Sequence, residues 1–244
     1  MSTAFLGDSA MALDAPGRHN SEFLTGLDVE IRAPLNGILG LADLLLETPL
    51  DERQKEYVAA TRLCAEGLLE QCSAALEFSD LDAGRIELDV ADFHLPQLLR
   101  GVAAQYRPRA EARGVRLVDT LDANLPELVV GDGVRLRHVV SQLLSHAVKL
   151  TPKGSIELNA TAMPVADGSY RLSIMVRDTG IGVAPGPLDV VPDEGSDCPE
   201  PARAPLSLAV ASRLVALMQG EMSAVSQTGQ GTTVSFWVPV RVPA

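Results

Sequence analysis

Residues 27–40, LDVEIRAPLNGILG, lie at the centre of the segment that decides the fold of the first third of the chain. Apolar side chains recur here at steps of three, four and seven residues, which is the spacing of one face of an α-helix. This apolar stripe consists of Leu24, Leu27, Ile31, Leu35, Ile38, Leu41, Leu44 and Leu45. Pro34 lies within the pattern and predicts a kink, because proline removes one backbone hydrogen bond. Val29 falls on another face of the predicted helix, where we expect it to be exposed.

A second helical segment follows a break at Pro49, and Asp51 is placed to cap it. Its apolar stripe consists of Tyr57, Ala60, Leu63, Leu68, Cys72, Ala75 and Leu76. Two helices of about 25 residues joined by a short turn predict an antiparallel helical hairpin over residues 21–82. A single hairpin cannot cover its own apolar stripe, so we expect two copies to form a homodimeric four-helix bundle.

Residues 86–242 contain helical and strand-like segments in mixed order. They predict a second domain of the α+β class, with helices on one face of a mixed sheet. Strands are expected at 85–93 and 115–122, helices at 95–114, 132–151 and 205–221, and hairpins at 155–180 and 222–240. Residues 1–20 are small, polar and unpatterned, and they predict a flexible leader.

Charge and composition limit the classes of function. The net charge is −12, and residues 1–85 carry 6 basic against 15 acidic side chains. This balance argues against nucleic acid or an anionic membrane as the main partner, because phosphate binding needs clustered lysine and arginine. No apolar run approaches the roughly 18 residues of a membrane span, and no secretory signal is evident, so we expect a cytoplasmic protein without a membrane partner. Cys64, Cys72 and Cys198 lack the spacing of a disulfide framework or metal site and predict buried, reduced thiols.

Four segments, in this order, resemble the core of hybrid-type two-component sensor histidine kinases. They are FLTGLDVEIRAPLNGILG at 23–40, GDGVRLRHVVSQLLSHAVKLTPKG at 131–154, VRDTGIGVAP at 176–185 and LMQGEMSAVSQTGQGTTVSFWVPV at 217–240. The resemblance implies a dimerising helical hairpin followed by a Bergerat-type ATP-binding α/β sandwich. It also implies that the exposed face of the bundle docks the receiver domain of a response regulator.

The first of these segments departs from the family at its reactive positions. Family members have a phospho-accepting histidine followed by Glu and, three residues after the Glu, by Thr or Asn before Pro. By the resemblance these positions are Val29, Glu30, Ala33 and Pro34. Valine has no nucleophilic lone pair and alanine cannot position water for dephosphorylation, so we expect no catalytic residue here. Val29 is then either an ordinary surface residue or a contact for a partner. The other histidines, His19, His94 and His138, are expected to be surface or hydrogen-bonded residues.

The second of these segments departs from the family at the positions that bind the metal ion. The resemblance places the family's Mg²⁺-binding asparagine at His146 and an upstream asparagine at Gln142. Mg²⁺ prefers hard oxygen ligands in octahedral geometry, so imidazole is a poor replacement and we expect no metal. Lys149 and Thr151 keep the family's residue types, and Lys149 retains the charge to meet a phosphate.

The third segment is intact. By the resemblance Asp178 accepts a hydrogen bond from the adenine amino group, while Gly180 and Gly182 allow close approach of the backbone. The turn could instead need the same glycines whether or not a ligand binds. The expected vestigial nucleotide site consists of His146, Lys149, Thr151, Asp178, Gly180 and Gly182.

The loop that follows has lost the glycines that present N–H groups to phosphates in the family. Pro205, Leu206 and Ser207 stand at these positions, and Pro205 has no N–H to donate. The segment before them carries Asp189, Asp193, Glu194, Asp197 and Glu200 against the single Arg203. We therefore expect no cofactor, and at most weak binding of ATP or ADP.

Together these departures predict that the chain is not an enzyme but a non-catalytic pseudo-histidine-kinase of two-component signalling. It would bind a response regulator or an active histidine kinase through its helical bundle. Two alternatives stay open: a histidine-phosphotransferase-like phosphorelay enzyme with a non-standard acceptor, and a regulator that senses adenine nucleotides.

Overall fold

The computed structural model describes residues 15–166, 168–182 and 206–243, with side chains of the first helix from Glu30 onward. The chain divides into two compact units, residues 1–86 and residues 87–244. No helix among the described residues is both long enough and apolar enough to cross a membrane.

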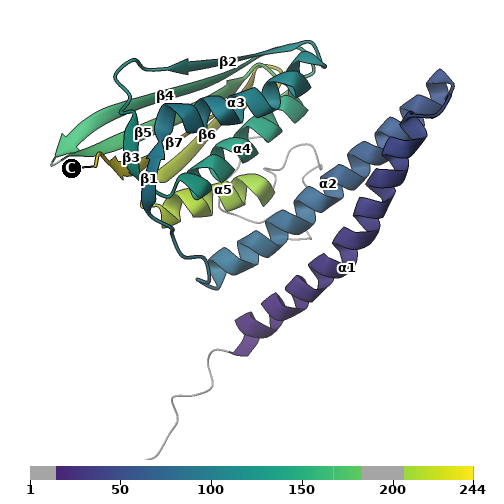
Figure 1. Ribbon diagram of the computed structural model, residues 1–244, viewed down its shortest axis with the longest axis horizontal. Helices are drawn as coiled ribbons and strands as arrows, with labels where there is room; N and C mark the ends of the chain where they lie inside the picture. The colour runs from purple at the N-terminus through teal and green to yellow at the C-terminus, as the bar shows by residue number, and fades with distance from the viewer. Residues whose placement is uncertain (1–14, 167, 183–205, 244) are drawn as a thin grey trace, which may run out of the picture. The chain divides into compact units, whose positions relative to one another are not determined.

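The first unit is a helical hairpin of α1 (Ala15–Leu46) and α2 (Glu52–Asp82), drawn in Figure 1. The prediction that residues 15–20 belong to a flexible leader is wrong, since the helix already begins at Ala15. Pro16 lies in its first turn, where a missing N–H breaks no helical hydrogen bond. The rest of the predicted leader, residues 1–14, lies outside the described residues.

The predicted cap of α2 is confirmed as a reciprocal capping box. The Asp51 carboxylate accepts a hydrogen bond from the N–H of Gln54 at 2.8 Å, and the Gln54 side chain accepts one from the N–H of Asp51 at 3.0 Å. Two N–H groups that the helix itself cannot satisfy are thereby paired. This fixes where the short turn ends and the second helix begins.

The two helices pack on each other through few side chains. Leu35 and Ala42 of α1 and Ala65 and Ala74 of α2 are buried. Polar contacts join the helices as well, from the Arg32 guanidinium to the Ser73 hydroxyl at 3.1 Å and from Arg62 to Asp43 at 3.3 Å. The larger apolar side chains are exposed on the single chain: Ile38, Leu41, Leu44, Leu45, Leu46, Tyr57, Leu63 and Leu68. Within the described residues, one hairpin thus leaves most of its apolar stripe uncovered.

The second unit is a mixed sheet with helices α3, α4 and α5. Its elements are β1 (Ala91–His94), α3 (Leu95–Glu111), β2 (Val115–Leu121), β3 (Leu128–Gly131), α4 (Gly133–Leu150), β4 (Gly154–Ala166), β5 (Ser169–Asp178), α5 (Leu206–Leu217), β6 (Glu221–Gln227) and β7 (Gly231–Arg241). The strand order is β1-β3-β7-β5-β4-β2, with β6 paired to β7. Strands β2 and β4 run parallel and the other pairs run antiparallel.

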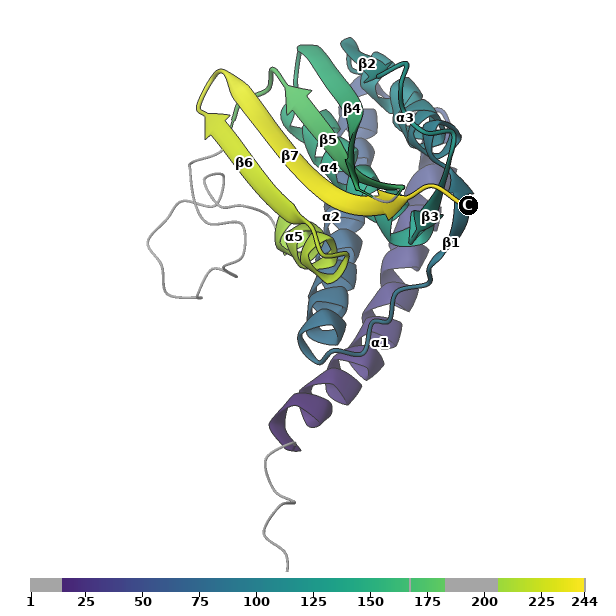
Figure 2. The ribbon, with the colours of Figure 1, turned by 90° about the vertical axis from the view of Figure 1, so that its left-hand side faces the viewer.

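All three helices cover one face of this sheet, as Figure 2 shows. Fully buried side chains come from both layers, including Leu144 and Leu214 from the helices and Leu172 and Ile174 from β5. The other face carries Trp237, whose ring lies 4.2 Å from the guanidinium carbon of Arg171. The predicted fold class, a helical hairpin followed by an α/β sandwich, is confirmed.

The segment that enters the sandwich is fastened to α4. The N–H of Asp89 donates a hydrogen bond to one carboxylate oxygen of Asp132 at 2.9 Å. The other oxygen of Asp132 accepts from the N–H of Arg135 at 2.8 Å, which caps the helix. A single buried carboxylate therefore joins the entering chain to the first turn of α4.

Three local predictions were wrong or incomplete. The strand expected from residue 85 begins only at Ala91, because the residues before it have no strand to pair with. The short strand β3 was not predicted at all. Cys64 is exposed rather than buried and Cys72 is half-buried, while Cys198 lies outside the described residues.

Candidate nucleotide site and acceptor helix

The acceptor segment lies in the middle of α1 and is open to solvent. Glu30, Ala33 and Pro34 are all exposed, and Pro34 is accommodated inside the helix. Val29 is part of the same helix, with a side chain outside the described ones. Arg32, between these residues, turns instead to Ser73 of α2. The structure thus brings the predicted acceptor positions together on an accessible stretch of the hairpin.

Asp178 ends β5 and is the buried anchor of the candidate nucleotide site. Its side chain is 4% exposed. One carboxylate oxygen accepts hydrogen bonds from the N–H of Gly180 at 2.8 Å and from the N–H of Thr232 at 3.3 Å. Burial raises the pKa of Asp178 above its ordinary value, and the two backbone hydrogen bonds act in the opposite direction. A carboxylate held in this way can accept a hydrogen bond from an amino group such as that of adenine.

The glycines after Asp178 are required by the packing of the backbone itself. A Cβ atom on Gly180 would lie 2.3 Å from the carbonyl oxygen of Leu150, and one on Gly182 would lie 2.2 Å from that of Gln227. Gly182 also has a φ of +69°, which L-residues with side chains rarely adopt. These two glycines are therefore evidence for the turn, and they do not by themselves indicate a ligand.

This turn is tied to α4 and to the final hairpin. The N–H of Ile181 donates to the carbonyl of Leu150 at 3.1 Å, and the carbonyl of Ile181 accepts from the N–H of Gly229 at 2.7 Å. Asp178, the end of α4 and the β6–β7 turn consequently form one connected frame. The contacts from Thr232 and Gly229 were not predicted, since these residues lie about fifty positions along the chain from the motif they support.

Polar side chains follow one face of α4 toward this frame, at steps of four residues. They are His138, Gln142 and His146. The side-chain nitrogen of Gln142 lies 2.7 Å from Nε2 of His138. Oε1 of Gln142 and Nε2 of His146 are buried and have no hydrogen-bond partner among the described residues. The step of four along a helix is the sequence signal by which the contact between His138 and Gln142 could have been predicted.

Both histidines on α4 are held in the neutral form near neutral pH. Burial, followed by the positive charge of Lys149, lowers the pKa of His146 to about 4. Burial, followed by the charge of Arg135, also lowers the pKa of His138. The α4 face is therefore lined by uncharged imidazole and amide groups, with Lys149 exposed one turn beyond His146.

These residues suit the adenine end of a nucleotide better than its magnesium ion. Asp178 supplies a buried acceptor, whereas His146 offers a nitrogen where Mg²⁺ requires oxygen. The Thr151 hydroxyl donates to the carbonyl of Ala147 at 2.7 Å and keeps no proton for a phosphate. Leu206 and Ser207 form the start of α5, while Pro205 and the acidic segment before it lie outside the described residues.

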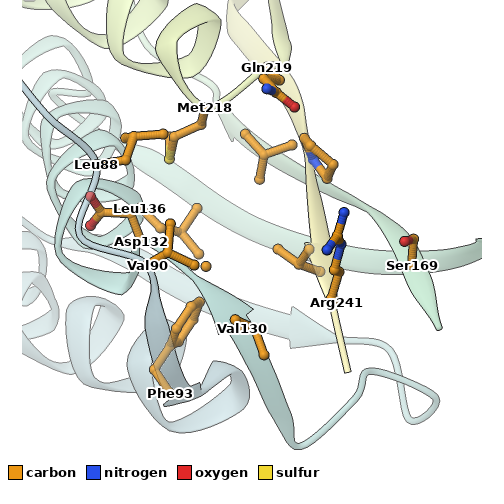
Figure 3. Close-up of a pocket in the computed structure, with 14 residues that line it drawn as sticks. Leu88, Val90, Phe93, Val130, Asp132, Leu136, Ser169, Met218, Gln219 and Arg241 are labelled. Atoms are coloured by element: carbon orange, nitrogen blue, oxygen red, sulfur yellow. The ribbon is translucent and has the colours of Figure 1, made fainter. Parts of the chain in front are cut away.

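A cavity of about 330 Å³ lies at the opposite end of α4 and is shown in Figure 3. Its walls are mainly apolar and include Leu88, Val90 and Phe93. Asp132 also lines it, but both oxygens of this carboxylate already accept backbone hydrogen bonds. Ser169, Gln219 and Arg241 line it as well, so this cavity has polar groups of its own.

Two family descriptions match the chain in the order of these units. Residues 19–84 match the His Kinase A (phospho-acceptor) domain. Residues 131–242 match the domain described as histidine kinase-, DNA gyrase B- and HSP90-like ATPase.

Whole-chain relatives agree with these matches. The chain is 34% identical to the sensor histidine kinase GacS of Pseudomonas protegens over 237 residues, which are 95% of this chain and 26% of that protein. It is 35% identical to the autoinducer 2 sensor kinase/phosphatase LuxQ of Vibrio parahaemolyticus over 230 residues, or 91% of this chain and 26% of that protein. The chain thus spans about a quarter of the length of these relatives.

Two solved structures match most of this chain. The full-length ShkA structure in complex with AMPPNP matches 92% of this chain and 47% of its own, with 34% identity and a TM-score of 0.64. The histidine kinase AdeS of Acinetobacter baumannii matches 86% of this chain and 96% of its own, with a TM-score of 0.52. At 16% identity, AdeS supports the fold alone.

These comparisons overturn the prediction that the chain is not an enzyme. That prediction rested on single positions such as Val29 and His146, whereas the whole chain is 34% and 35% identical to proteins named as sensor kinases. With both domains present in family order, the chain belongs to the two-component sensor histidine kinase family.

Proposed function

We propose that the chain acts in two-component signalling by binding a response regulator or a partner histidine kinase through its helical hairpin. The observation that carries this proposal is the exposed surface of α1 formed by Glu30, Ala33 and Pro34. The residue directly before Glu30 in the sequence is Val29, which offers no nucleophile. In this proposal the acceptor of a transferred phosphoryl group therefore belongs to the partner.

Dimerisation supports the same function. The match to the phospho-acceptor domain makes pairing of hairpins the expected assembly in this family. The exposed stripe around Leu41, Leu44 and Leu63 supplies the apolar surface for such pairing. We propose a homodimer through residues 21–82, or a heterodimer with a related kinase that offers a similar stripe.

Charge reversal on the exposed surface tests the docking function. Purified receiver domains, and the hairpin region of related kinases, are titrated against the full chain by calorimetry. We expect the Glu30→Lys variant to bind the cognate receiver or hairpin about tenfold more weakly, because the surface charge that orients the partner is reversed. The matched control is Glu47→Lys, the same charge change at an exposed residue in the turn directly after α1.

Two outcomes would contradict the proposal. One is the absence of binding to every receiver domain and kinase hairpin tested. The other is an equal loss of binding in Glu30→Lys and Glu47→Lys, which would indicate a general effect of net charge instead of a docking surface.

A further inference from the structure

Two buried polar atoms on α4 lack hydrogen-bond partners among the described residues, and both lie on the face that leads toward Asp178. They are Oε1 of Gln142 and Nε2 of His146, one helical turn apart. Burying a polar atom without a hydrogen bond is unfavourable. A ligand that pairs with these atoms therefore gains interactions that no described residue provides.

The chemistry of this pair allows it to bind an anion. A neutral imidazole carries its proton on one ring nitrogen, so Nε2 of His146 can donate a hydrogen bond. The contact between His138 and Gln142 is equally satisfied with the amide reversed, since amide oxygen and nitrogen exchange places. The ring N–H of His138 then donates to the amide oxygen, and the Gln142 amide N–H takes the unpaired position. The face of α4 can in this way present two uncharged N–H donors.

These donors share a connected frame with the Asp178 anchor. The hydrogen bond from Ile181 to Leu150 and the close approach of Gly180 to Leu150 hold the Asp178 turn against the end of α4. His146 lies one turn before that end, and Lys149 adds an exposed positive charge beside it. An acceptor for an amino group and donors for an anion thus occupy two parts of the same site.

We propose that this site binds adenine nucleotides without a magnesium ion, with the N–H groups of His146 and Gln142 donating directly to phosphate oxygens. The oxygen ligands that Mg²⁺ needs are replaced by donors, and a donor meets a phosphate without an intervening cation. The proposal is independent of docking by the hairpin, because it concerns residues of the second unit alone.

Calorimetric titration of the full chain with ADP, in excess EDTA and in excess Mg²⁺, tests the proposal. We expect ADP to bind in EDTA, with an affinity that Mg²⁺ changes by less than about threefold. The His146→Asn variant should bind ADP in EDTA about tenfold more weakly, because asparagine is shorter than histidine and its amide cannot place an N–H at the position of Nε2. Adenosine, which has no phosphate, should bind the variant and the original chain equally.

The matched control is His94→Asn, the same substitution at an exposed residue whose side chain makes no capping hydrogen bond. It should leave ADP binding unchanged. Fluorescence of Trp237, the single tryptophan, checks that each variant is folded. The titration of the unsubstituted chain in EDTA needs no variant and decides the proposal even if His146→Asn is unstable.

Three results would overturn the proposal. The first is no binding of ADP in EDTA, and the second is an affinity that Mg²⁺ raises by about tenfold or more. The third is a folded His146→Asn variant that binds ADP in EDTA as tightly as the original chain does. Binding of the hairpin to receiver domains is measured separately, so failure here leaves the docking function standing.

Discussion

Acidification should destabilise the second unit through His146. Burial lowers the pKa of this imidazole to about 4 in the folded chain, against an ordinary value of 6.5. Between these two values the unfolded chain binds the proton and the folded chain does not. The neutral histidine therefore contributes its full stability above pH 6.5, and this contribution is lost as the pH falls toward 4.

The size of the effect follows from the two pKa values. Lowering the pH from about 7.5 to about 5.5 should remove about 1.3 kcal/mol of unfolding free energy through His146 alone. Staying at pH 5.5 keeps the chain above its isoelectric point of about 4.7, where low net charge favours precipitation.

Urea unfolding followed by the fluorescence of Trp237 measures this contribution, because Trp237 belongs to β7 of the second unit. The comparison is between the original chain and His146→Asn, each at both pH values. The burial of His138 lowers its pKa and that of Asp178 raises its pKa, and both contributions are common to the two proteins. The original chain should lose about 1.3 kcal/mol more than the variant does. Equal losses in the two proteins would refute the assignment of a buried neutral imidazole at position 146.

Further predictions concern packing, assembly and the turn after Asp178. Leu144→Ala removes a fully buried side chain of α4 and should lower the free energy of unfolding in urea by about 2–5 kcal/mol. A decrease below about 1 kcal/mol would show that the core is not packed as described. Leu41→Asp should convert the proposed dimer to a monomer in analytical ultracentrifugation, because it places a charge in the apolar stripe. Val225→Asp on β6, at a position 74% exposed, should leave the mass unchanged. An unchanged mass for Leu41→Asp would exclude this stripe as the dimer surface. Gly182→Ala should lower the midpoint of thermal unfolding and reduce the free energy of unfolding by more than about 1 kcal/mol. The reason is that Gly182 has a positive φ and that a Cβ atom there would meet the carbonyl of Gln227. An unaltered midpoint would contradict that close approach.

Much of the fold could be predicted from local sequence patterns. The apolar spacing around Leu35 predicts α1, and the pair Asp51 and Gln54 fixes the start of α2. The predicted ends of strands were wrong where they depend on which residues have a neighbouring strand to pair with. The alternation from residue 85 resembles a strand, yet only Ala91 and the residues after it have β3 to pair with. Strand β3 itself is too short, at 4 residues, to show a period.

The candidate site could likewise be predicted only where its residues are close together in the sequence. Asp178 and its glycines are contiguous, so the motif could be found directly in the sequence. The N–H of Thr232 that reaches Asp178 lies 54 residues away, and no local pattern connects the two. The exposure of Cys64 likewise depends on how α1 and α2 pack on each other, which the local sequence around Cys64 does not show.

The hydrogen bond from Asp89 to Asp132 has a mechanical consequence. The second unit begins at Glu87, and Asp89 is bonded to α4 two residues later, before the first strand begins at Ala91. A movement of the chain that enters this unit would therefore reach α4 before it reaches the sheet. Helix α4 has 18 residues, so about 27 Å of continuous helix lies between this attachment and the far end of α4. His146 stands near that far end. The Asp132→Ala variant would detach the entering segment from α4 and remove the cap of this helix, while Asp178 and His146 stay unchanged.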